Sequence, residues 1–193
     1  MEMLIKDNDL YLFSKICNLK CEICLEDLNI FPIKKINLKD INDMLKNFKI
    51  NHVYIQGGEL YLYDNYKGLL DILKKYNVFI STNGFNSNFV VDLLNQKNII
   101  IEFKILTSAL KYKILTKYDN NSLMESLNIV YNRNKKYNIK IKYINDFYSL
   151  NDDFLEYRKY IMKSQNTYFI GFDKKFKNNY RDIMNFPNVI YLD

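Results

Sequence analysis

A chain of 193 residues, with 48% apolar residues, 26% charged residues and a net charge of +6, is typical of a single globular domain spanning residues 1–193. No apolar run approaches the ~20 residues that cross a bilayer, and residues 1–6 lack a signal-peptide pattern. No dense Lys/Arg block with interleaved aromatic residues occurs, so the positive charge favours a solvated lysine-rich surface. We therefore expect a cytoplasmic protein without a membrane or nucleic-acid partner.

Short apolar runs alternate with segments of helical periodicity, which indicates βαβ units around a parallel sheet. The strands are expected at 10–13, 53–56, 78–81, 99–103, 139–144, 167–172 and 189–192. The helices are expected at 38–48, 65–76, 87–95, 108–117, 122–136, 152–163 and 180–184. Six or seven strands are too few for a closed eight-stranded barrel. The sequence therefore predicts an α/β fold with an open, partial (β/α)6 barrel.

All three cysteines lie in one short segment, Cys17, Cys21 and Cys24, with a C-x3-C-x2-C spacing. An odd count in one segment argues against a disulfide framework. A structural zinc site needs four ligands, and the single histidine, His52, has no second Cys or His beside it. Three thiolates suit a 4Fe–4S cluster with one open iron. Zinc or a purely structural cluster are the alternatives.

Polar residues follow three further strands at the point where each expected strand ends. Gly57-Gly58-Glu59 follows the second, Thr82-Asn83-Gly84 the third and Lys104 the fourth. In parallel α/β proteins, ligands bind at the carboxyl ends of strands, so these residues and the cysteines should gather at one edge. The alternatives are a turn with a capping acid, an Asx-type turn and a surface lysine.

The cysteine motif after a strand resembles the cluster motif of radical S-adenosylmethionine (radical SAM) enzymes. Gly57-Gly58-Glu59 resembles the Gly-Gly-Glu-Pro motif of that family, with Leu60 in place of proline, and residues 81–84 resemble its Thr-Asn-Gly. The resemblance implies that Cys17, Cys21 and Cys24 hold a 4Fe–4S cluster whose open iron binds S-adenosyl-L-methionine. An electron from the cluster then cleaves the sulfonium to give methionine and a 5′-deoxyadenosyl radical.

The resemblance also implies roles for the surrounding side chains, with no catalytic residue apart from the cluster. Gly57, Gly58 and Glu59 would receive the methionine end of the cofactor, and Ile23 would pack against the adenine. The carboxylate and ribose side would be lined by Ser81, Thr82, Asn83, Lys104 and Lys142.

Two later segments resemble glycyl-radical-enzyme activating proteins. Residues 102–104 are similar to their Asp-Ile-Lys, and residues 111–116 to their Tyr-Lys-x-Leu-Thr-Gly, although no glycine follows Thr116 and Lys142 stands where arginine is usual. This implies activation of a glycyl radical enzyme such as anaerobic ribonucleotide reductase, with a reductant such as flavodoxin or ferredoxin. The alternatives are a small-molecule or peptide-modifying radical SAM enzyme (7-carboxy-7-deazaguanine synthase-like, or a peptide maturase) and a non-catalytic iron–sulfur or zinc module.

Overall fold

The computed structural model describes residues 1–19, 21, 34–35, 37–105, 112–113, 116–142, 155–170 and 189–192. Within these residues, nine strands form one sheet in the order β3-β1-β2-β4-β5-β6-β7-β8-β9. Every pairing from β2 to β9 is parallel, whereas β1 pairs antiparallel with both β2 and β3. The strands are β1 Glu2–Lys6, β2 Asp9–Ser14, β3 Lys34–Lys35, β4 His52–Gly57, β5 Asn77–Thr82, β6 Ile99–Ile105, β7 Tyr137–Lys142, β8 Asn166–Ile170 and β9 Val189–Leu192.

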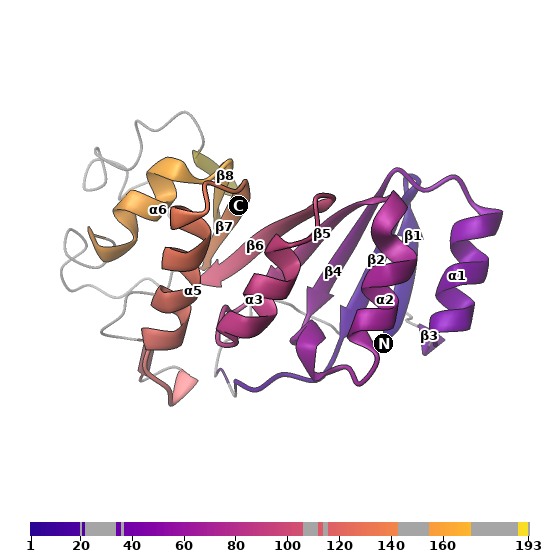
Figure 1. Ribbon diagram of the computed structural model, residues 1–193, viewed down its shortest axis with the longest axis horizontal. Coiled ribbons are helices and arrows are strands. Elements are labelled where there is room, and N and C mark those ends of the chain that lie inside the picture. The colour runs from indigo at the N-terminus through magenta and orange to yellow at the C-terminus, as the bar shows by residue number, and fades with distance from the viewer. Residues whose placement is uncertain are drawn as a thin grey trace.

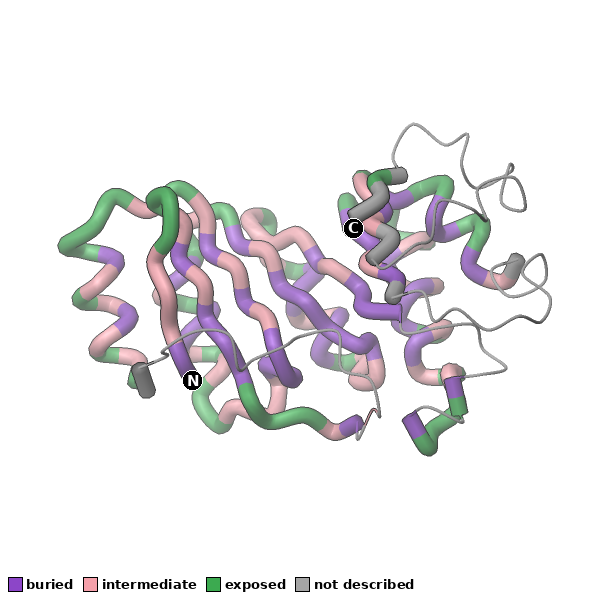
Figure 2. Tube along the Cα trace, turned by 180° about the vertical axis from the view of Figure 1, so that it is seen from behind, coloured by how far each residue is buried: buried purple, intermediate pink, exposed green. Residues whose placement is uncertain are grey.

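The helices of the described part of the chain cover one face of this sheet, and Figure 2 shows the strands from the other side without those helices in front. The two ends of the sheet, β3 and β9, do not pair, so the barrel is open (Figure 1). The predicted α/β fold with an open partial barrel is therefore confirmed. The helices are α1 Leu38–Asn47, α2 Tyr66–Ile72, α3 Ser87–Leu94, α5 Asn121–Asn132 and α6 Arg158–Lys163, with 3₁₀ turns at Leu60–Leu62, Leu73–Lys75 and Leu155–Tyr157.

The core lies between the sheet and these helices. Side chains alternate along each strand, and the alternate positions that face the helices are apolar and buried, as Leu12, Ile55, Ile80 and Ile101 are across four neighbouring strands. The other face carries the stacked rings of Tyr11, Tyr54 and Phe79, whose successive centroids are 4.9 Å and 4.9 Å apart. The described residues contain no helix long and apolar enough to cross a membrane.

The N-terminal hairpin was not predicted. Lys6 pairs with Asp9 across a two-residue loop, and both loop residues have positive φ, 53° at Asp7 and 65° at Asn8. This is the backbone of a type I′ turn, which matches the twist of the flanking strands. The hairpin adds β1 to the edge of the parallel sheet and covers β2.

Helix boundaries differ from the predicted ones for local reasons. Helix α1 starts with a capping box, in which Asn37 Oδ1 accepts from Asp40 N at 3.0 Å and Asp40 Oδ2 from Asn37 N at 2.9 Å. Phe48, the last residue of the predicted helix, follows the observed helix and is 51% exposed. Helix α5 stops at Asn132 because Asn134 adopts the left-handed conformation (φ 56°) that ends helices.

The remaining elements are shifted or lie partly outside the described residues. The second predicted helix ends at Ile72 and tightens into a 3₁₀ turn, as final helical turns often do. Strand β7 begins two residues before its predicted start, at Tyr137. The helix predicted at 108–117 lies mostly outside the described residues, and the helix predicted at 180–184 lies wholly outside them.

Candidate functional site

The segment that leads to the cysteines is held against the end of strand β4 by backbone hydrogen bonds. Gly58 N donates to Ser14 O at 2.5 Å, and Glu59 N donates to Ile16 O at 2.7 Å. Gly57 has φ 89°, a conformation that favours glycine. A Cβ at position 57 would overlap Ser14 O, and a Cβ at position 58 would lie 2.6 Å from the Ile16 carbonyl carbon. The two glycines are therefore needed for this close approach of two backbones.

Glu59 is completely buried, and both of its carboxylate oxygens accept hydrogen bonds from the end of β5. Thr82 Oγ1 donates to Glu59 Oε2 at 2.6 Å, and Asn83 N donates to Glu59 Oε1 at 2.7 Å. Burial raises the pKa of Glu59, while the charge of Lys104 and these two hydrogen bonds act in the opposite direction. A carboxylate offers about four acceptor positions, so two donors leave room for further ones.

Lys104 places a buried positive charge beside the Gly57-Gly58 turn and near Glu59. Its side chain is 7% exposed, and Nζ donates to Gly57 O at 2.5 Å and to Gly58 O at 3.5 Å. The predicted alternative of a surface lysine does not fit this burial. Lys104 therefore stabilises the carbonyl side of the Gly57-Gly58 turn and supplies positive charge near Glu59.

Asn83 connects the buried carboxylate to the cysteine segment. Its backbone N–H donates to Glu59, while its Nδ2 donates to Asn18 Oδ1 at 2.9 Å and lies 3.9 Å from Cys17 Sγ. Its Oδ1 accepts from Phe85 N at 3.0 Å, which fixes the orientation of the side-chain amide. The ends of β2, β4 and β5 thus meet around a single asparagine.

The cysteines are described only in part. Cys17 is exposed, and Cys21 is half-buried against the core. Cys24 and Ile23 lie outside the described residues. No group of three potential metal-ligating side chains occurs among the described residues, a set that does not include Cys24.

Two other predicted site residues are placed differently. Ser81 donates to Glu102 Oε1 at 2.7 Å, and Lys140 Nζ lies 3.1 Å from the same oxygen. Successive strand residues point to opposite faces, so Ser81 and Thr82 do not share a partner. The backbone of Lys142 pairs with Ile170 in the sheet, but its side chain lies outside the described set.

Sequence reasoning missed three residues that stand close to this group. Asn18 accepts a hydrogen bond from the side-chain amide of Asn83. Its position directly after Cys17 is the feature of the sequence that could have indicated this contact. Tyr61 and Tyr112 have pKa values raised first by burial, and the charges of Glu59 and Cys17 also contribute at both. No periodicity in the sequence distinguishes Tyr61 from an ordinary core tyrosine.

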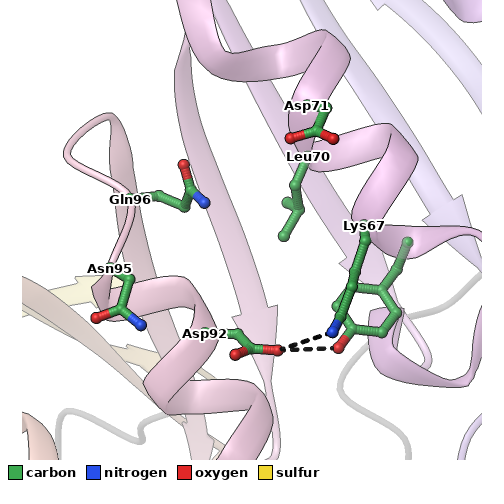
Figure 3. A pocket seen from close by; sticks show the side chains of 7 residues that line it. Lys67, Leu70, Asp71, Asp92, Asn95 and Gln96 are labelled. Carbon is green, nitrogen blue, oxygen red and sulfur yellow. Dashed lines mark hydrogen bonds and ion pairs between the residues drawn. The ribbon is translucent and has the colours of Figure 1, made fainter.

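A hollow on the helix side of the sheet lies apart from this group. It is lined by residues of α2 and by residues on and just after α3, and Tyr66 Oη donates to Asp92 Oδ2 at 3.1 Å across it (Figure 3). Lys67 Nζ lies 4.0 Å from the same oxygen. None of the predicted site residues lines this hollow, which the ion pair and hydrogen bond partly bridge.

Replacing Lys104 by methionine should lower the free energy of unfolding by about 2–3 kcal/mol, because hydrogen bonds from a charged group contribute about 1.5–3 kcal/mol and two buried carbonyls lose their donor. Chemical denaturation of the purified protein measures this loss. Lys140→Met is the matched control. Lys140 lies beside Lys104 in the register of β6 and β7, but its ammonium group forms an ion pair with Glu102. Equal losses in the two variants would contradict the assigned role of Lys104.

The sequence is 26% identical over 132 residues to a protein of Methanocaldococcus jannaschii that is named as a glycyl-radical enzyme activating enzyme. The match covers 65% of this chain and 51% of that protein. No protein-family model matches the chain. The predicted resemblance to glycyl-radical-enzyme activating proteins is confirmed by this comparison.

Solved structures show the same fold. SuiB of Streptococcus suis bound to S-adenosylmethionine has a TM-score of 0.71 at 20% identity, covering 95% of this chain and 48% of that one. SuiB bound to the precursor peptide SuiA has a TM-score of 0.70 at 19% identity, covering 96% and 49%. TYW1 with a lysine–pyruvate adduct bound has a TM-score of 0.53 at 15% identity, covering 80% and 62%. The chain spans about half the length of SuiB and of the M. jannaschii protein.

Proposed function

We propose that this chain is a radical SAM enzyme. Cys17, Cys21 and Cys24 would hold a 4Fe–4S cluster, and Glu59 and Lys104 would bind the methionine end of S-adenosylmethionine beside it. When bound, the reduced cluster supplies the electron that cleaves the cofactor to a 5′-deoxyadenosyl radical for hydrogen abstraction. The observation that carries this proposal is the hydrogen-bonded connection from buried Glu59 through Asn83 to Cys17.

The described residues fit these groups in chemical character. Soft thiolate ligands suit iron–sulfur clusters, and Cys17 and Cys21 lie on a segment fixed by the backbone contacts of Ser14 and Ile16. A carboxylate buried away from water needs a cationic partner, and an ammonium group of the cofactor would supply one. Burial raises the pKa of Glu59, and the nearby charge of Lys104 acts in the opposite direction; a cofactor ammonium would act in the same direction as Lys104.

Lys104 and Asn83 have positioning roles in this proposal. A lysine ammonium has three donor protons, and two of those of Lys104 go to Gly57 O and Gly58 O. The third would donate to the cofactor carboxylate. Asn83 holds Asn18 and Cys17 in register with Glu59, so ligand binding at the carboxylate and at the cysteine segment would be coupled.

The decisive experiment is anaerobic reconstitution with iron and sulfide, followed by reduction with dithionite and assay of 5′-deoxyadenosine formed from S-adenosylmethionine. The proposal predicts a brown protein that produces 5′-deoxyadenosine and methionine in equal amounts. A protein that binds zinc but no iron, or that holds a cluster without cleaving the cofactor, would identify a non-catalytic metal module instead.

Replacing Glu59 by glutamine should weaken S-adenosylmethionine binding roughly ten- to a hundredfold while iron content stays unchanged. The reason is the loss of a charge-assisted contact of about 1.5–3 kcal/mol. Glutamine keeps the shape: its amide oxygen can accept from Asn83 N and its amide nitrogen can donate to Thr82 Oγ1, so the fold should persist. Calorimetric titration of the reconstituted protein measures the affinity, and an unchanged value would leave Glu59 with a purely structural role.

The same variant has a pH signature in the iron-free protein. Because burial raises the pKa of Glu59 above its ordinary value of 4.5, its contribution to stability is greatest below that value and declines as the pH rises through the raised folded-state value. Glu59→Gln should therefore flatten the dependence of unfolding free energy on pH at and above pH 4.5.

For the substrate, we propose a glycine residue of a partner glycyl radical enzyme, such as anaerobic ribonucleotide reductase. The likeness to the M. jannaschii protein named for this activity supports the choice, as do the segments around Lys104 and Thr116. Flavodoxin or ferredoxin would serve as the reductant, in the cytoplasm. Mixing the reduced protein with a glycyl radical enzyme of the same genome and S-adenosylmethionine should yield a glycyl radical doublet by electron paramagnetic resonance.

A peptide substrate is the second candidate, favoured by the fold shared with SuiB, which has been solved with its precursor peptide. The radical SAM proposal is common to both candidates. If no glycyl radical partner gives the doublet, whereas a peptide or a small molecule drives 5′-deoxyadenosine formation in proportion to its own conversion, the activating role is wrong and the modifying role is supported.

A further inference from the structure

Ser126 is a buried serine within helix α5, and its hydroxyl group bonds outside its own helix. The residue is 0% exposed, and its Oγ donates to Gly84 O at 2.6 Å. A serine at a buried helical position is less favourable than alanine unless its hydroxyl is paired. In many helices such a hydroxyl bonds to a carbonyl of the preceding turn. Here the bond to Gly84 connects α5 to the turn that follows β5.

Gly84 lies in a narrow space between α5 and strand β6. Its φ is 72°, and a Cβ at this position would lie 2.9 Å from Leu123 Cδ1 and 3.2 Å from Phe103 Cδ1. Leu123 and Phe103 are both 0% exposed. The position of Gly84 is therefore fixed by packing on both sides and, at its carbonyl, by Ser126.

From Gly84 the hydrogen bonds continue to the buried carboxylate of Glu59. Gly84 N donates to Thr82 Oγ1 at 3.1 Å, and Thr82 Oγ1 donates to Glu59 Oε2 at 2.6 Å. A threonine hydroxyl has one proton and two lone pairs. Because a backbone N–H can only donate, Gly84 N occupies a lone pair of Thr82 Oγ1 and leaves its proton for the carboxylate. A path of hydrogen bonds through Gly84 thus connects Ser126 to Glu59.

We infer that Ser126 is a positioning residue for the binding of S-adenosylmethionine, because its bond to Gly84 keeps the Thr82 hydroxyl directed at Glu59. The inference rests on the proposed function, which assigns Glu59 to the methionine end of the cofactor. A hydrogen bond to a carboxylate favours its charged form, and the charged form is the one that attracts an ammonium group. Without the Ser126 hydroxyl, residues 82–84 are held less firmly and the carboxylate is less well oriented, so the cofactor binds more weakly.

The test is the affinity for S-adenosylmethionine in Ser126→Ala, measured by calorimetric titration of the reconstituted protein. The variant should bind the full amount of iron but bind the cofactor about two- to tenfold more weakly, which is the range for one net hydrogen bond. Ser126→Thr, which keeps the hydroxyl, should restore the affinity. Ser164→Ala is the matched control, because Ser164 is also buried and its Oγ donates to a backbone carbonyl at the end of α6, Ile161 O, at 2.9 Å. Its affinity should stay the same.

A double variant separates positioning from general destabilisation. In a Glu59→Gln background, Ser126→Ala should cause no further loss of affinity, because the carboxylate through which Ser126 acts is absent. An equal loss in both backgrounds overturns the role of Ser126 and leaves the proposed function intact. An unchanged affinity in iron-loaded Ser126→Ala has the same meaning.

Hydrogen–deuterium exchange in the unchanged reconstituted protein covers the case in which Ser126→Ala does not fold. Adding S-adenosylmethionine should slow exchange of the Gly84 amide, since binding at Glu59 holds Thr82 and Gly84 more firmly. The amide of Val78, which donates to Asn98 O at 2.9 Å, should exchange at the same rate as before. Exchange at Gly84 that the bound cofactor leaves unchanged overturns the role of Ser126 alone. Failure of the unchanged protein to bind S-adenosylmethionine overturns the proposed function as well.

Discussion

Alanine in place of Gly58 should lower the free energy of unfolding by about 2–3 kcal/mol and prevent assembly of the proposed cluster. The added Cβ would overlap Ile16 O and lie 2.6 Å from the Ile16 carbonyl carbon. These are backbone atoms, so the cysteine segment must move away from β4. That movement breaks the hydrogen bonds from Gly58 N to Ser14 O and from Glu59 N to Ile16 O. Chemical denaturation and iron content after reconstitution measure the two effects.

Gly68→Ala is the matched control for this prediction. Gly68 lies within helix α2, and the nearest atom to its added Cβ is Asn65 Oδ1 at 2.5 Å, which belongs to a side chain that can rotate. Alanine is favoured over glycine in a helix by up to about 1 kcal/mol. This variant should therefore fold with similar stability and load iron normally. If Gly58→Ala behaves in the same way, the close approach of the two backbones does not hold the site together.

Much of the sheet could be predicted because its strands have simple patterns. Strand β6, Ile99–Ile105, reads as a nearly continuous apolar run, as expected for a strand buried on both sides. The hairpin of β1 and β2 has no such signal, since its turn uses Asp7-Asn8 without the glycine that usually marks a type I′ turn. Strand β3 is two residues long and exists through its pairing with β1, which no local pattern indicates.

The gathering of the candidate site residues at one edge of the sheet could be predicted, but the contacts among them could not. Neighbouring parallel strands end at the same edge, so Glu59 and Asn83 were expected near the cysteines, and hydrogen bonds connect Glu59 through Asn83 to Cys17. The alternation of side chains along a strand could have predicted that Ser81 and Thr82 point to opposite faces of the sheet. The contact of Lys104 with two glycine carbonyls depends on side-chain direction across the sheet. Spacing in the sequence carries no information about that direction.

Replacing any one of Cys17, Cys21 or Cys24 by alanine should remove the brown chromophore or leave it labile, and should abolish formation of 5′-deoxyadenosine. The three thiols are the only cysteines of the chain, so no other thiolate can take the place of a lost one. Iron and sulfide analysis, with the absorption spectrum after anaerobic reconstitution, measures the loss. An unchanged cluster in any of the three variants would exclude that cysteine as a ligand.

Asn18→Ala is the informative companion to the cysteine variants, because it removes a contact of the cysteine segment and leaves all three thiols. Asn18 accepts from Asn83 Nδ2 at 2.9 Å, and that amide also approaches Cys17 Sγ. The variant should bind iron in full but lose it faster to a chelator, since the segment is less well positioned while its ligands persist. Loss of iron as complete as in Cys17→Ala would mean that the fold of the segment, and not the thiolate, limits assembly.

A purified protein holding one zinc ion per chain and no iron after reconstitution would contradict the cluster itself, because three cysteines and a fourth ligand would then form a closed tetrahedral site.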